Sequence, residues 1–73
     1  MPLKPLPYRE VKRKLMAAGF AEVSSKGSHV KFSHQTERGT LIVIVPNHRE
    51  VAVGTLRSIL RQARLSQEEF EIL

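Results

Sequence analysis

The sequence contains no cysteine, no aspartate and no tryptophan. Without cysteine, the chain cannot use thiol catalysis, disulfide bonds or cysteine-based zinc sites, which is consistent with a reducing compartment. The longest apolar run, residues 41–45, is too short to cross a bilayer. Residues 1–7 lack the continuous apolar segment of a signal peptide. We therefore expect a soluble, cytoplasmic protein.

The chain is short and has few aromatic residues. Its 73 residues suffice for one domain, 1–73, with one modest core and little space for a buried pocket. A surface site, or help from a partner protein, is therefore favoured over a deep cleft. The one tyrosine and three phenylalanines are expected mostly in the core, so no stacked platform for reading bases is predicted.

Positive charge dominates most of the chain. Twelve basic residues face seven glutamates, a net charge of +5, but three of these glutamates lie at positions 68, 69 and 71. Residues 1–65 therefore carry twelve basic and four acidic groups, a net of +8. A small domain of this charge favours a polyanionic partner, and nucleic acid is the leading candidate. The alternative is that the excess charge serves only solubility.

Apolar residues recur at helical spacing in two parts of the chain. After an extended segment, 1–7, the first stripe predicts an amphipathic helix that ends at Gly19. The second stripe predicts a helix entered through residues 54–55. Ser66 and Glu69 have capping-box spacing and predict a short C-terminal helix over 66–73. The two stripes consist of Tyr8, Val11, Leu15 and Ala18, and of Leu56, Ile59, Leu60 and Ala63.

Three strand-like stretches lie between the two main helices, at 20–25, 29–34 and 40–45. Their short connections, including a polar loop at 35–39, indicate an antiparallel meander. The order αβββα predicts a two-layer α+β sandwich in which two helices cover one face of a three-stranded sheet. Residues 41–45 are apolar on both sides of their strand, so something should cover the second face. The tail helix, a second copy or a partner protein could do so.

The segment Lys26-Gly27-Ser28-His29 followed by alternating residues is the clearest sign of a functional site. Side chains alternate across a strand, so His29 and Lys31 share one face while Val30 and Phe32 share the other. An imidazole titrates near neutral pH and can accept or donate a proton. The neighbouring cation indicates a negatively charged ligand. The simpler alternative is a polar histidine at a strand edge.

The other histidines are weaker candidates. His29 and His34 are five residues apart, so a regular strand points them to opposite faces and argues against a shared metal. With no cysteine or aspartate, and no glutamate at ligand spacing, we expect no metal site. His34 is expected to be a solvated hairpin residue. His48 can either contact RNA from its loop or cap local backbone.

Three arginines on the second helix, at positions 57, 61 and 64, share one side of it. They form either the solvated face of an amphipathic helix or a track for phosphates, and the pattern does not decide between these.

Several sequence blocks together resemble the HicA family of bacterial toxins. They are Gly19-Phe20, Lys26-Gly27-Ser28-His29 with Phe32, Val45-Pro46-Asn47-His48, and the run from Gly54 to Ala63. The resemblance covers nearly the whole chain and implies a double-stranded-RNA-binding-like αβββα fold. Two positions depart from it. Val30 stands where many members have a second histidine, and Arg64 where many have glycine.

The resemblance implies a toxin–antitoxin endoribonuclease that cleaves messenger RNA, with His29 as the catalytic residue and a HicB-type antitoxin as partner. No cofactor is implied. Cleavage by the RNA's own 2′-hydroxyl needs proton transfer and positive charge near the phosphate, which His29 and nearby lysines can supply. The predicted RNA-binding residues are Lys26, Gly27, Ser28, Lys31 and His48. The alternatives are an RNA-binding module without catalysis and a pure protein-interaction domain.

Overall fold

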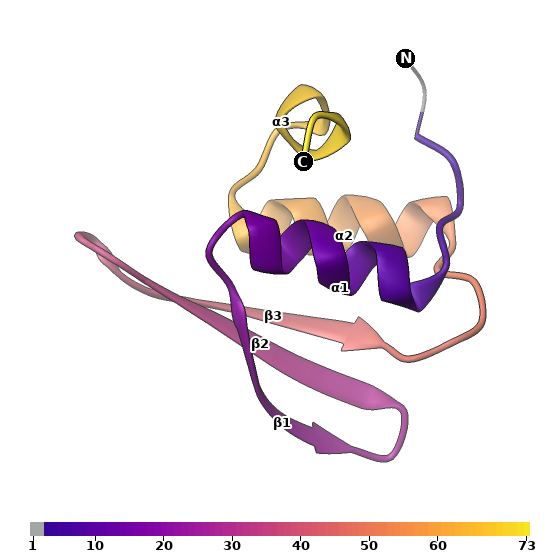
Figure 1. The fold of residues 1–73 in the computed structure, drawn as a ribbon, viewed down its shortest axis with the longest axis horizontal. Helices are drawn as coiled ribbons and strands as arrows, with labels where there is room; N and C mark the ends of the chain where they lie inside the picture. The colour runs from indigo at the N-terminus through magenta and orange to yellow at the C-terminus, as the bar shows by residue number, and fades with distance from the viewer. Residues whose placement is uncertain (1–2) are drawn as a thin grey trace.

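The computed structural model describes residues 3–73, which form a two-layer αβββα sandwich with a short third helix (Figure 1). Residues 1–2 of the predicted extended segment lie outside this range. The sheet is antiparallel with strand order β1-β2-β3, and α1 and α2 lie on one of its faces, as predicted. The elements are α1 (Tyr8–Ala17), β1 (Ala21–Lys26), β2 (His29–Thr36), β3 (Gly39–Pro46), α2 (Val53–Ala63) and α3 (Gln67–Glu71).

The second hairpin is tighter than the sequence suggests. The predicted loop at 35–39 is wrong, because Gln35 and Thr36 belong to β2 and Gly39 begins β3. The Thr36 hydroxyl donates to the Gly39 carbonyl at 2.7 Å, and the Thr40 hydroxyl donates to Gln35 Oε1 at the same distance. These hydroxyls satisfy polar groups that a solvated loop would leave to water, so the strands continue to a two-residue turn.

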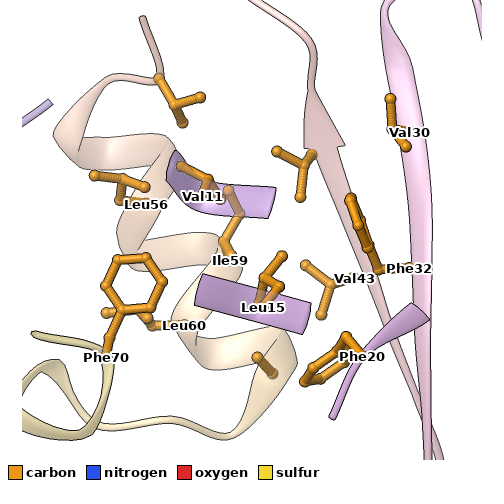
Figure 2. Close-up of a cluster of buried hydrophobic side chains, with 13 residues drawn as sticks. Val11, Leu15, Phe20, Val30, Phe32, Val43, Leu56, Ile59, Leu60 and Phe70 are labelled. Atoms are coloured by element: carbon orange, nitrogen blue, oxygen red, sulfur yellow. The ribbon is translucent and has the colours of Figure 1, made fainter. Parts of the chain in front are cut away.

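The core lies between the sheet and the helices (Figure 2). Val30 and Phe32 of β2 point into it, so the alternation predicted for this strand is confirmed. Burying a side chain such as Phe32 contributes about 1.5–3 kcal/mol relative to leaving it exposed. The core consists of Val11, Leu15, Phe20, Val30, Phe32, Val43, Val45, Val51, Leu56, Ile59, Leu60, Ala63 and Phe70.

Helix α3 packs on the helical layer and lies away from the sheet (Figure 1). Its predicted capping box is present: Glu69 N–H donates to Ser66 Oγ at 3.0 Å, and Ser66 N–H donates to Glu69 Oε1 at 2.7 Å. Phe70 is buried among the helices. The ammonium of Lys14 on α1 donates to the carbonyls of Phe70 and Leu73 at 3.0 and 3.1 Å. The tail helix is therefore held against α1.

Because α3 lies on the helical side, it does not cover the second face of the sheet. We call this the outer face. Ile42 and Ile44 of β3 lie on it and are 40% and 39% exposed. Of the three expected covers for this strand, the tail helix is excluded. The outer face carries Lys26, His29, Lys31, Ser33, Ile42 and Ile44.

His34 is not the solvated hairpin residue that the sequence suggests. It lies on the inner face, half-buried, with its ring 5.1 Å from the buried ring of Phe20. The expected opposite orientation of His29 and His34 is confirmed, since His29 lies on the outer face. His34 therefore has a packing role near the end of α1.

Candidate functional site

A two-residue turn, Gly27-Ser28, connects β1 to β2 and places His29 at the start of the second strand. Gly27 has φ +59°, and it is the first central residue of the turn, as in type II′ hairpins. An added Cβ at Gly27 would meet nothing within 4 Å. The glycine is therefore required by the backbone conformation of the turn and not by crowding.

Lys26, His29 and Lys31 lie together on the outer face. Lys26 is the direct cross-strand partner of His29, so their Cβ atoms are about 4.5–5.5 Å apart. Lys31 is two residues further along β2 on the same face, about 7 Å away. All three side chains are exposed. Within residues 3–73 neither lysine forms an ion pair. The imidazole therefore lies between two cations whose charge is available to a ligand.

Two of the four basic residues of α1 differ from these lysines, because each forms an ion pair with a glutamate of the protein. Lys12 Nζ lies 2.9 Å from Glu22 Oε1, and Arg13 Nη2 lies 2.6 Å from Glu10 Oε1. The hydrogen bond from Arg13 lowers the pKa of Glu10, and the hydrogen bond to Glu22 raises the pKa of Lys12. Half of the basic groups of α1 are therefore neutralised locally, whereas Lys26 and Lys31 of the outer face are not.

The segment that follows β3 runs beside the turn. Pro46 is the cross-strand partner of His29, and Asn47 N–H donates to the Ser28 carbonyl at 2.5 Å. Further on, Val51 and Leu6 exchange backbone hydrogen bonds of 2.6 and 3.1 Å, which anchor the end of this loop. His48, which directly follows Asn47 in the chain, is exposed. No hydrogen bond links it to His29 within the described residues.

Four neighbours of the site were not among the site residues predicted from the sequence. They are Ile42, Ile44, Pro46 and Asn47. Ile44 is opposite Lys31, and Ile42 is opposite Ser33. The doubly apolar pattern of 41–45 was the available signal for the two isoleucines. Nothing in the local pattern indicated the bond from Asn47, because it depends on the register of β3 against β2.

The described residues offer neither a cluster for a metal ion nor a helix for crossing a membrane. Residues 3–73 contain no group of three or more histidine, aspartate, glutamate or cysteine side chains placed to hold a metal ion. No helix in this range has the length and apolar character needed to span a membrane. The principal candidate site is thus a basic, exposed sheet face centred on an imidazole.

A family model described as the HicA toxin of bacterial toxin–antitoxin matches residues 8–65. This range contains all three strands and helices α1 and α2. No curated protein matches the chain significantly. The family match extends over well more than half of the sequence, so the chain belongs to the HicA family of toxins from bacterial toxin–antitoxin systems.

Proposed function

We propose that this toxin is a metal-independent endoribonuclease that cleaves messenger RNA, with His29 as the general acid–base residue. The observation that carries the proposal is the position of His29, exposed on the outer face between Lys26 and Lys31. Family membership supports the toxin role. The proposed independence from metal ions is supported by the donor set, which offers no ligand cluster around the imidazole within the described residues.

In the proposed reaction the 2′-oxygen of a ribose forms a bond to the adjacent phosphorus, and the bond from phosphorus to the 5′-oxygen breaks. The 2′-hydroxyl loses a proton and the leaving 5′-oxygen gains one, so the products are a 2′,3′-cyclic phosphate and a 5′-hydroxyl. His29 carries one of these proton transfers. Lys26 and Lys31 stabilise the negative charge that builds up on the phosphorus oxygens.

The test is RNA cleavage by the purified protein in excess EDTA, with the product ends identified by mass spectrometry. We expect a 2′,3′-cyclic phosphate from the wild type and a rate lower by about 10²–10⁴-fold for His29→Ala. His34→Ala is the matched control, because His34 lies on the opposite face. Wild-type cleavage by His29→Ala would overturn the role of His29.

The second candidate is an RNA-binding module that uses the same face without catalysis. One observation favours it: within residues 3–73 no side chain forms a hydrogen bond that orients the His29 ring. This candidate predicts salt-sensitive binding of RNA by the wild type and no product at any time. The same cleavage assay separates it from the endoribonuclease.

Membership in a toxin–antitoxin family implies a cognate antitoxin. We propose that it is a HicB-type protein with an acidic surface that covers the outer face and occludes His29. Lys26 and Lys31 complement the negative charge of such a surface. Ile42 and Ile44 offer apolar area for the centre of the interface. Co-expression should rescue growth that the toxin alone arrests. Ile44→Lys should weaken the complex, while Met16→Lys, on α1, should leave it intact.

A further inference from the structure

Arg64 has an unusual backbone conformation. It directly follows α2 with φ 57° and ψ 41°, and it is the only non-glycine residue with positive φ in the described range. Its N–H donates to the Arg61 carbonyl at 3.3 Å, and Leu65 N–H donates to the Leu60 carbonyl at 3.0 Å. Glycine would close the helix in the same way without strain. The arginine side chain is therefore present at a conformational cost, which points to a use for it.

Arg64 lines a surface cleft of about 520 Å³ at the end of the β2–β3 hairpin. Its other walls are residues 36–41, so the cleft also contains Arg38. Within residues 3–73 neither guanidinium forms a hydrogen bond or an ion pair. Glu37 is the single acidic residue of the lining. The cleft thus contains two arginines with unused donors.

Two further arginines, Arg57 and Arg61, lie on α2, the helix that ends next to this cleft. Arg57 and Arg61 are four residues apart and share one side of α2, and Arg64 directly follows the end of the helix; all three residues are exposed. Helix α2 contains no acidic residue. This arrangement differs from that of α1, where Lys12 and Arg13 are paired with glutamates.

We propose that this cleft binds a phosphate group of the RNA backbone, held by Arg38 and Arg64, with Arg61 and Arg57 continuing the contact along the strand. The planar fork of an arginine matches phosphate oxygens with two parallel hydrogen bonds. Seven residue steps along β2 lead from His29 to Thr36, so the cleft lies about 23 Å from the site at His29. The bound phosphate is therefore not the one that is cleaved, and the cleft positions the substrate.

RNA is favoured over an acidic protein segment as the occupant. A stable protein interface needs an apolar centre, and among the cleft residues only Leu41 is a large apolar residue. A row of unpaired arginines without such a centre is the arrangement that contacts a polyanionic backbone. The inference rests on the proposed action on RNA.

The test uses a fluorescent single-stranded RNA and the His29→Ala background, in which the probe is not cut. Binding is measured by fluorescence anisotropy over a range of salt concentrations. We expect Arg64→Gly and Arg38→Gln each to reduce the slope of log K against log salt by about 0.7, and the double variant by about twice that. Arg64→Gly removes the guanidinium and also relieves the positive φ, so its melting temperature should be equal or higher. A fall in affinity therefore cannot be attributed to unfolding.

Arg9→Gln is the matched control, because Arg9 is an exposed arginine on α1 and should leave the slope unchanged. Unchanged slopes for both cleft variants overturn the proposal, and so does a weaker antitoxin complex combined with an unchanged RNA slope. If the protein binds no RNA, the proposed function fails separately, and inorganic phosphate becomes the probe. Phosphate-induced NMR shifts at Arg38 and Arg64 then support the anion site, and their absence overturns it.

Discussion

Gly19 and His34 lie so close together that a Cβ at position 19 would be 2.7 Å from His34 Nε2. Gly19 also has φ +106°, which L side chains rarely adopt. The end of α1 and the middle of the sheet therefore meet through a glycine and a half-buried imidazole. The same imidazole packs on Phe20.

We expect Gly19→Ala to lower the free energy of unfolding by about 1–3 kcal/mol, because it adds both a steric overlap and backbone strain. Urea denaturation measures the change. Gly54→Ala is the control: its Cβ would meet nothing within 4 Å, and it lies in the first turn of α2. This substitution should be neutral or stabilising. Equal losses for the two variants would contradict the close contact.

The sequence predicts the elements of this fold well because each rests on a local pattern. Helical spacing places α1 and α2, and the capping box places α3. Alternation places Val30 and Phe32 inside and His29 outside. The strand ends are less well predicted, since the side-chain hydrogen bonds of Thr36 and Thr40 extend the second hairpin.

The arrangement of the site depends on long-range relationships that local patterns do not contain. Lys26 is opposite His29 because the turn has two residues, and a different turn length would shift this register. His34 is half-buried because the end of α1 and Phe20 reach over it. Arg38 and Arg64 line the same cleft because of where the β2–β3 hairpin ends relative to α2. The roles of His29 and the lysines stay predictions.

Phe70 ties α3 to the core, although it lies beyond the matched range 8–65. We expect Phe70→Ala to cost about 3–5 kcal/mol. A domain of this size has a stability of only about 4–11 kcal/mol, so the variant should lose a large part of its free energy of unfolding. Ile72→Ala is the control, because Ile72 is 86% exposed and its loss should change stability by less than about 0.5 kcal/mol. A small effect of Phe70→Ala would mean that α3 is not required for the core.

The capping box makes the docking of α3 sensitive to acid. Hydrogen bonds from Ser66 lower the pKa of Glu69 below its ordinary value of 4.5. A carboxyl group with a lowered folded-state pKa stabilises the fold above its unfolded pKa, and this contribution is lost as pH falls through the folded pKa. We therefore expect wild-type stability to decrease below about pH 4.5 more than that of Glu69→Gln. Urea denaturation at several pH values measures the difference. Parallel pH profiles would show that this carboxyl does not contribute.

The charges around His29 should govern RNA affinity more than those of α1. Lys26 and Lys31 have no ion-pair partner in residues 3–73, whereas Lys12 is bound to Glu22. We expect Lys26→Ala with Lys31→Ala to reduce the salt slope of single-stranded RNA binding by about 1.4, because each phosphate contact contributes about 0.7. Lys12→Ala should reduce it by much less. Anisotropy titrations in the His29→Ala background measure both variants. If the double lysine variant keeps the wild-type slope while Arg64→Gly does not, the RNA follows the arginines of α2 and does not cross the outer face at His29.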